Sequence, residues 1–267
     1  MPTLEEIKTR QQVTWSSGDY GKIAWITQPL AEVLADVLEI WPGSDVLDVA
    51  TGTGHAALAA ARRFARVTGV DYVPALLEVA RNRAAAEGLD ANFIEGDAEN
   101  LPVPDERFDY VVSTIGAMFA PNQEKTASEL LRAARPGGTI GMVNWRPEGF
   151  IGELFRTIAK HVPPPEGLKP AALWGSEERV RELFGDAVSD VNFKDGAIRI
   201  SFLSPEHFAD FFITNYGPTL KASEALEGER REAFRGDLIE LARKHNARTD
   251  GTIALDWTYL LVIATKA

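Results

Sequence analysis

The middle of the chain alternates between short apolar runs and longer amphipathic stretches. The apolar runs predict strands over 45–50, 65–71, 92–96, 108–114 and 139–144. The amphipathic stretches predict helices over 56–64, 74–87 and 123–134. Gly88 follows the second helix and Pro136-Gly137-Gly138 follows the third, as is typical of helix ends. Strands that alternate with helices in this way indicate a mostly parallel sheet with both faces covered.

The two flanks of this region follow a different pattern. The N-terminal flank contains Trp15, Tyr20 and Trp25 ahead of an amphipathic helix near 27–40. The C-terminal flank predicts helices over 151–161, 177–184, 205–216 and 220–246, a pair of strands over 188–193 and 197–202, and a last strand over 253–265. We therefore divide the chain into a helical lid segment over 1–43, a core over 44–147, and a C-terminal part over 148–267.

Polar and glycine residues gather where the predicted strands end. These residues are the stretch 48–54, Asp71, Asp97 and the pair 113–114. Ligands of parallel sheets bind beyond the carboxyl ends of the strands, so we expect these residues to converge. A glycine turn that opens a helix lets a ligand reach free N–H groups, and Asp71 is placed to hold ribose hydroxyls. The sequence thus predicts a site for a cofactor that contains a nucleoside.

The glycine turn alone does not identify that cofactor. Residues 52–57 also fit the looser G-x-G-x-x-A form of a dinucleotide fingerprint, which leaves a nicotinamide-dependent oxidoreductase as an alternative. Two carboxylates argue against this oxidoreductase alternative. Asp48 lies before the glycines, where it can meet a positively charged amino acid, and Asp97 can accept from an exocyclic adenine amine. The chain also lacks the Tyr-x-x-x-Lys pair of short-chain dehydrogenases.

The chain carries a family resemblance in four ordered motifs, which lie over 45–54, 96–102, 108–113 and 130–138. With them the chain resembles the class I S-adenosylmethionine-dependent methyltransferases, in particular the ubiquinone/menaquinone-biosynthesis type (methyltransferase types 11 and 25). The resemblance implies an α/β fold with a Rossmann-like, seven-stranded, mostly parallel sheet and one antiparallel strand. The late strands complete that sheet, and the helices between them, at about 204–247, form an added substrate cap. A non-catalytic sensor of S-adenosylmethionine or S-adenosylhomocysteine remains a second alternative.

The same resemblance implies which residues bind S-adenosylmethionine. Ala50, Gly52 and Gly54 would line its methionine part, Asp71 would bind its ribose, and Ser113 would approach the sulfonium. The full set of expected cofactor residues is Asp48, Ala50, Thr51, Gly52, Gly54, Asp71, Tyr72, Gly96, Asp97, Ala98 and Ser113. Thr51 stands where the family often has glycine, which is a departure from the pattern.

Methyl transfer from a sulfonium is an in-line displacement, so the positioning of the acceptor can supply much of the catalysis. The expected acceptor residues are Trp15, Tyr20, Met118, Phe119, Trp145, Arg146, Phe211, Phe212 and Tyr216. Core packing is the competing interpretation of each. Together they indicate a pocket for an aromatic or lipophilic metabolite, methylated at oxygen or carbon rather than nitrogen. His207 and then His55 are the candidates for a catalytic base.

Composition and charge limit the kinds of partner that the chain is expected to bind. The net charge of −11 is spread along the chain and argues against nucleic acid as the main partner. The chain has no cysteine, and its histidines and carboxylates show no metal-binding spacing, so we expect no metal. It shows no signal-peptide pattern and no apolar run that would span a membrane. We therefore expect a cytoplasmic enzyme of small molecules, and a homodimer is compatible with these properties.

Overall fold

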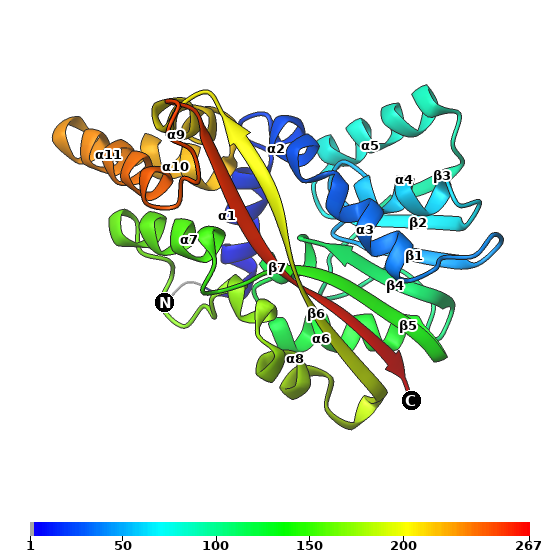
Figure 1. Ribbon diagram of the computed structural model, residues 1–267. Coiled ribbons are helices and arrows are strands. Elements are labelled where there is room, and N and C mark those ends of the chain that lie inside the picture. The colour runs from blue at the N-terminus through cyan, green and yellow to red at the C-terminus, as the bar shows by residue number, and fades with distance from the viewer. Residues whose placement is uncertain (1–2) are drawn as a thin grey trace.

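The computed structural model describes residues 3–267, which form one mixed β-sheet with helices around it (Figure 1). Its seven strands lie in the order β3-β2-β1-β4-β5-β7-β6. Their bounds are β1 Asp45–Val49, β2 Arg66–Asp71, β3 Ala91–Glu95, β4 Phe108–Thr114, β5 Ala134–Trp145, β6 Val188–Phe202 and β7 Ile253–Lys266. Strands β1 to β5 pair in parallel, whereas β7 is antiparallel to both β5 and β6. The predicted fold class is confirmed.

Helices cover both faces of the sheet, as the alternation of elements predicts (Figure 1). One face carries α3 Pro29–Val37, α4 His55–Ala61 and α5 Pro74–Glu87, and the other carries α6 Gln123–Ala133 and α8 Glu177–Phe184. All five residues of β1 are buried, as are the five alanines and Leu58 that form residues 56–61 of α4. Because these alanines have short side chains, α4 can lie close to β1 and β2. This packing fixes the turn that joins β1 to α4.

The predicted pair of strands over 188–193 and 197–202 was wrong, because β6 is one continuous strand. Its pairing with β7 runs from Val188 opposite Lys266 to Phe202 opposite Ile253. Gly196 lies in the middle of this ladder and not in a turn. A Cβ at Gly196 would come within 2.3 Å of Cζ of Tyr259 on β7, so glycine leaves room for that ring.

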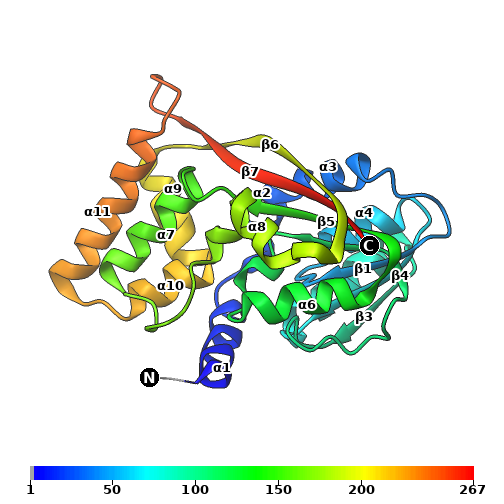
Figure 2. The ribbon, with the colours of Figure 1, turned by 90° about the horizontal axis from the view of Figure 1, so that it is seen from below.

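A second group of helices packs beyond the carboxyl ends of the parallel strands (Figure 2). It consists of α7 Phe150–His161, α9 Pro205–Asn215, α10 Gly217–Glu224 and α11 Gly228–Lys244. Phe150, Phe208 and Phe234 are among its fully buried side chains. The single helix predicted over 220–246 is divided into α10 and α11, and Gly228 at the start of α11 has a positive φ of 50°. We call this group of four helices the helical cap.

The N-terminal residues form two helices that the sequence pattern did not predict, α1 Leu4–Trp15 and α2 Tyr20–Thr27. The predicted helix over 27–40 is the shorter α3, because Pro29 begins a new helix. Thr3 and Glu6 form a capping box at the start of α1. The other end of α1 touches the helical cap, where a Cβ at Gly217 would lie 2.1 Å from the carbonyl oxygen of Thr14. The N-terminal segment therefore packs against the helical cap.

Three short 3-10 helices complete the structure, namely Ala117–Phe119, Ala171–Gly175 and Gly185–Ala187. Within residues 3–267, no helix is both long enough and apolar enough to span a bilayer.

Candidate active site

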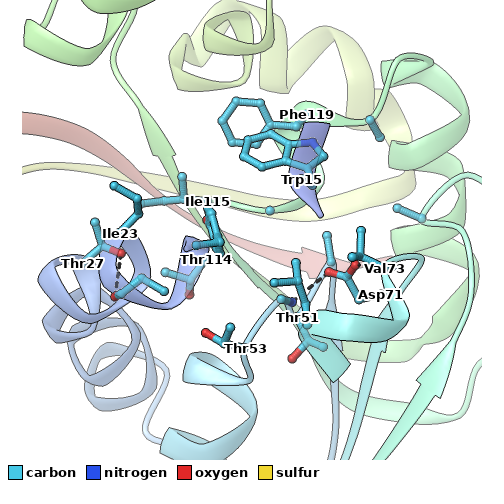
Figure 3. Close-up of a pocket in the computed structure, with 18 of the residues that line it drawn as sticks. Trp15, Ile23, Thr27, Thr51, Thr53, Asp71, Val73, Thr114, Ile115 and Phe119 are labelled. Carbon is cyan, nitrogen blue, oxygen red and sulfur yellow. Dashed lines mark hydrogen bonds between the residues drawn. The ribbon is translucent and has the colours of Figure 1, made fainter. Parts of the chain in front are cut away.

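One cavity opens where β1, β2 and β4 end, between the sheet, the N-terminal helices and the helical cap. It holds about 1300 Å³ of empty space, including its mouth. Trp15 and Phe119 lie against each other on one side of it, and Asp71 and Thr51 lie together on another (Figure 3). We call the part around Lys8, Asp48, Asp71 and Asp97 the charged end. The aromatic end is formed by Trp15, Phe119, Trp145, Phe155, Phe212, Tyr216 and Trp257.

The turn after β1 shapes the floor of the charged end. Ala50, Gly52 and Gly54 have positive φ values of 54°, 54° and 84°. Gly116, which follows β4, packs tightly against this turn, since a Cβ there would lie 2.3 Å from the carbonyl oxygen of Ala50. Positive φ at a non-glycine residue costs free energy, and such strain clusters at functional sites. The backbone of the turn is therefore held in place from two strands.

Asp48 is the most deeply buried carboxylate of the site, with 1% of its surface exposed. It accepts hydrogen bonds from the hydroxyl of Thr51 at 2.5 Å and from the backbone N–H of Ala57 at 2.9 Å. Burial raises the pKa of Asp48 to about 7, although these two hydrogen bonds oppose the shift. The threonine that departs from the family pattern thus supports this carboxylate.

Asp71 ends β2 and connects the turn after β1 with the start of α5. Its carboxylate accepts from the backbone N–H groups of Gly52 at 2.8 Å and Val73 at 2.9 Å. Burial raises the pKa of Asp71 to about 6, against the effect of these bonds. The carboxylate therefore organises the backbone of the site and also lines its cavity.

Lys8 brings α1 to the charged end. Its Nζ lies 2.6 Å from Oδ2 of Asp97 and 2.7 Å from Oε2 of Glu99. Burial would lower the pKa of Lys8, but the hydrogen bonds to these two carboxylates outweigh burial and raise it. The next turn of α1 adds a hydrogen bond from Nε2 of Gln12 to the carbonyl oxygen of Tyr72, at 2.5 Å. Helix α1 is thus fastened across the cavity by polar contacts.

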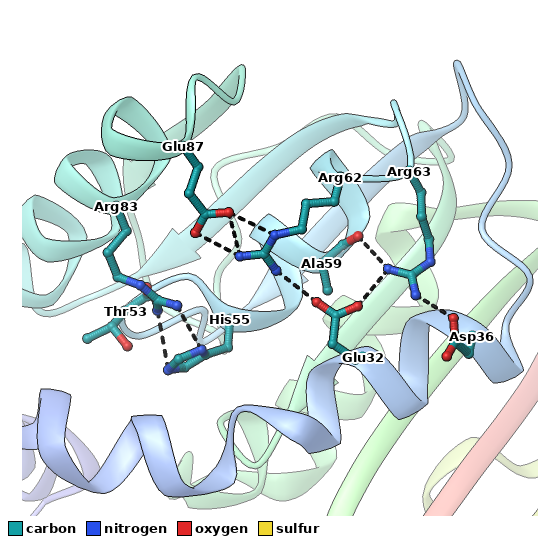
Figure 4. A network of polar contacts seen from close by, with 9 residues as sticks. All are labelled: Glu32, Asp36, Thr53, His55, Ala59, Arg62, Arg63, Arg83 and Glu87. Carbon is teal, nitrogen blue, oxygen red and sulfur yellow. Dashed lines mark hydrogen bonds and ion pairs between the residues drawn. The ribbon is translucent and has the colours of Figure 1, made fainter.

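His55 also lines the charged end, but the guanidinium of Arg83 lies against both of its ring nitrogens (Figure 4). Arg83 lies 3.2 Å from Nε2 and 3.1 Å from Nδ1 of His55, and it donates to the carbonyl oxygen of Thr53 at 2.7 Å. Burial, followed by the charges of Arg83 and Arg62, lowers the pKa of His55 to about 3. The imidazole is therefore neutral at physiological pH and is a poor base.

The aromatic end is assembled from elements that are far apart in the sequence. The ring of Trp15 lies 4.8 Å from that of Phe119 and 5.9 Å from that of Tyr216, measured between centroids. Phe212 lies 5.6 Å from Tyr216 and 5.9 Å from Trp257. No charged side chain is present among the described residues of this end. Its walls are therefore suited to an apolar ligand with flat faces.

The structure brings most of the expected site residues together at the cavity. The expected residues that line it are Asp48, Ala50, Thr51, Gly52, His55, Asp71, Tyr72, Gly96, Asp97, Ala98, Trp15, Tyr20, Phe119, Trp145, Phe212 and Tyr216. Gly54 and Ser113 lie behind it. Ser113 donates to the carbonyl oxygen of Val49 and accepts from the N–H of Ala117, so it supports the end of β4.

Four other candidates lie outside the cavity. Met118 is buried in the core, and Phe211 packs against Phe202 on the outer side of α9. Arg146 turns away to Asp195 and to the carbonyl oxygen of Gly175. His207 is exposed on the helical cap, where its Nδ1 accepts from the N–H of Leu203 at 3.3 Å. The geometry does not support His207 as a base, because it is not among the residues that line the cavity.

Several cavity residues were missed by reasoning from the sequence. Lys8 and Gln11 come from α1, whose mixed sequence carries no motif. Ile151, Leu154 and Phe155 come from α7, and their only signal was an apolar helix face that core packing explains equally well. Their place in the site depends on how the flanking helices pack on the sheet, which no local pattern reveals.

The charges of the cavity favour one kind of ligand. Asp48, Asp71 and Asp97 line it, whereas Lys8 is the one ammonium or guanidinium group among the described residues that line it. Because Lys8 is already paired with two carboxylates, the diphosphate of a dinucleotide would meet no free cation. A ligand with cationic groups and a ribose fits the charged end better. Among residues 3–267, no cluster of histidine, aspartate and glutamate side chains could hold a metal ion.

Comparisons with known proteins agree with this geometry. Residues 46–138 match a family model described as a methyltransferase domain. The chain is 38% identical to the "Uncharacterized protein Rv1405c" of Mycobacterium tuberculosis, over 98% of this chain and 96% of that protein. It is 39% identical to a demethylmenaquinone methyltransferase of Thermus thermophilus, over 45% of this chain and 56% of that enzyme. The crystal structure of YcgJ from Bacillus shares the fold, with a TM-score of 0.63 at 21% identity, over 88% of this chain and 97% of YcgJ.

Proposed function

The chain belongs to the class I S-adenosylmethionine-dependent methyltransferases, whose methyl donor is S-adenosylmethionine, and we propose that it methylates a small, uncharged aromatic or lipophilic acceptor at oxygen or carbon. One observation carries the proposal. The aromatic end of the cavity has flat apolar walls and no charged side chain among the described residues that line it. An acceptor bound there would be held by its shape and its apolar surface.

The absence of charge at the aromatic end favours neutral acceptors over charged ones. A carboxylate or phosphate would lose its hydration without gaining a cationic partner, and a protonated amine would gain no carboxylate. A neutral phenol, enol or related compound loses little on entering. This difference favours methylation of oxygen or carbon over methylation of nitrogen.

We assign the charged end to the cofactor. Asp71 would accept hydrogen bonds from the ribose hydroxyls, and the turn at Gly52 would lie along the methionine part with Asp48 beneath it. Tyr72 and Asp97 would border the adenine. In this arrangement the bound cofactor supplies an electrophilic methyl group on a sulfonium. The side chains of the aromatic end would orient the acceptor toward it and exclude water.

The acceptor itself is proposed to provide the nucleophile. His55 is neutral, buried and occupied by Arg83, so it is not placed to remove a proton from the acceptor. His207 lies outside the cavity. An acidic phenol or an enol would enter uncharged and lose its proton to solvent next to the positively charged sulfonium, so it would need no base from the protein. As the new bond to the methyl group forms and the bond from sulfur to that methyl breaks, the negative charge of the acceptor and the positive charge of the sulfonium would partly cancel in the transition state, which a dry apolar site favours.

The N-terminal segment and the helical cap are proposed to enclose the acceptor. Helices α1 and α2 provide Trp15, Tyr20 and Ile23, while the cap provides Phe155, Phe212 and Tyr216 among others. The two meet directly where α1 ends against α10. A cavity lined from both sides, with an aromatic end apart from the charged end, supports an enzyme rather than a protein that only senses the cofactor.

The test is an acceptor panel with S-adenosylmethionine, in which formation of S-adenosylhomocysteine and of methylated product is measured by mass spectrometry. The panel contains matched bicyclic compounds that carry a phenol, a primary amine or a carboxylate. We expect turnover with phenols and little or none with amines and carboxylates. Turnover restricted to amines or carboxylates would contradict the proposed acceptor class. Tight cofactor binding without turnover of any neutral acceptor would favour the sensor.

A further inference from the structure

Two tyrosine hydroxyls lie in the cavity without a partner in the protein. Tyr20 begins α2, and Tyr216 stands between α9 and α10. Both residues line the cavity. Neither hydroxyl forms a hydrogen bond with any residue of the described chain 3–267, whereas the hydroxyl of Tyr110 donates to the carbonyl oxygen of Glu39. Only 6% of the surface of Tyr216 is exposed. Each hydroxyl is therefore unpaired within the protein at the wall of the cavity, where it is free to bond to a ligand that enters.

The positions of the two rings place them at the junction of the charged and aromatic ends. Cε1 of Tyr20 would lie 3.8 Å from a Cβ at Gly52, so this ring lies against the turn that we assign to the methionine part of the cofactor. Trp15 lies edge-on to both tyrosines, with centroid distances of 5.7 Å to Tyr20 and 5.9 Å to Tyr216. The two phenols therefore pack against one indole, where the cofactor site gives way to the acceptor site.

The electrostatic surroundings keep both phenols protonated. Burial and the nearby carboxylate of Asp71 raise the pKa of Tyr20 to about 12. Burial and the proximity of Tyr20 raise the pKa of Tyr216 well above its ordinary value. Both groups therefore act as hydrogen-bond donors at neutral pH and not as bases.

We propose that the hydroxyls of Tyr216 and Tyr20 donate hydrogen bonds to an oxygen of the acceptor and so select aromatic acceptors that carry a hydroxyl or carbonyl group next to the site of methylation. This inference rests on the proposed function, and it names the chemical feature that the aromatic end recognises. An acceptor without that oxygen would leave one or both hydroxyls unpaired. A site that hydrogen-bonds a polar group of its ligand strongly rejects an analogue without that group. An apolar pocket discriminates less between ligands that differ only in size.

The test compares the binding of two probes of similar shape, 2-naphthol and 2-methylnaphthalene, to protein saturated with S-adenosylhomocysteine. Binding is measured by equilibrium dialysis for the wild-type chain and for Tyr216→Phe, Tyr20→Phe and Tyr110→Phe. Tyr110→Phe is the matched control, because it removes a hydroxyl that is bonded within the protein and far from the cavity lining.

We expect the wild-type chain to prefer 2-naphthol about tenfold, as one or two neutral hydrogen bonds imply. Tyr216→Phe and Tyr20→Phe should each lose most of this preference while binding 2-methylnaphthalene as before, and Tyr110→Phe should keep it. A preference unchanged in both cavity variants would overturn the inference, as would equal binding of the two probes by the wild-type chain. Failure of the wild-type chain to bind either probe would instead overturn the proposed aromatic acceptor, and with it the inference that rests on it.

Discussion

Replacing Lys8 with methionine tests how α1 is held over the cavity. The substitution keeps most of the apolar stem and removes the ammonium that bonds to Asp97 at 2.6 Å and to Glu99 at 2.7 Å. Apart from these bonds, α1 buries Ile7 and contacts α10 near its end. Gln11 and Gln12 also donate hydrogen bonds to backbone carbonyl oxygens outside the helix. The helix should therefore separate from the cavity more readily in Lys8→Met, without unfolding of the sheet.

The size of the effect follows from how exposed each partner is. Glu99 is 5% exposed in its side chain, and a hydrogen bond to such a buried charged group contributes about 1.5–3 kcal/mol. Asp97 is 33% exposed, so solvent screens its pairing and we assign it about 0.5–1 kcal/mol. The sum of about 2–4 kcal/mol predicts that the open state of α1 becomes at least about 30-fold more populated.

Hydrogen exchange of the backbone amides of α1 measures this population directly. Exchange over 4–15 should accelerate about 30-fold or more in Lys8→Met, while β1 and β4 exchange as in the wild-type chain. Lys125→Met is the matched control, since the ammonium of Lys125 is half exposed and lies 3.6 Å from Glu129, away from the cavity. Unchanged exchange of α1 in Lys8→Met, or the same acceleration in Lys125→Met, would refute the reasoning.

Three further substitutions test the charged end. Asp71→Ala should weaken binding of S-adenosylmethionine by about 1–3 kcal/mol through the loss of hydrogen bonds to a charged group, and unchanged affinity by calorimetry in a folded variant would exclude its ribose role. Burial raises the pKa of Asp48 to about 7 in the folded state, above the unfolded value of about 4. Between pH 4 and pH 7 the folded chain therefore binds more protons than the unfolded chain, so its free energy of unfolding falls as the pH rises through this range. Asp48→Asn should flatten that dependence in urea unfolding between pH 4 and pH 7, and an unchanged slope would contradict the assignment. His55→Gln should leave the pH dependence of kcat above pH 5 unchanged, since the pKa of His55 is lowered to about 3, and a lost ionisation near pH 6 to 7 would identify it as a base after all.

The core of the fold and the charged end of the site could be predicted because their signals are local. A strand, a glycine turn and an acidic residue are adjacent in the sequence, and parallel strands bring such ends together without further information. Asp48, Gly52, Asp71 and Asp97 accordingly line one cavity. Even the division between α2 and α3 had a local signal in Pro29, which lacks the N–H that a continuous helix requires.

The aromatic end could not be predicted in the same way, because it depends on contacts between distant segments. Phe211 and Phe212 are neighbours on one helix, yet only Phe212 lines the cavity, since the packing of α9 on β7 decides which side faces inward. Lys8 has partners 89 and 91 residues away in the sequence. The break predicted between the strands over 188–193 and 197–202 is absent, and Gly196 instead leaves room for the ring of Tyr259 on the neighbouring strand. Each of these outcomes is set by tertiary packing.

Calorimetric titration with S-adenosylmethionine, S-adenosylhomocysteine and NADH in parallel tests the central claim most directly. The charged end offers three carboxylates and one ammonium that is already paired. We predict micromolar binding of S-adenosylmethionine and S-adenosylhomocysteine and no measurable binding of NADH. Binding of NADH with no binding of the two sulfur compounds would contradict this prediction.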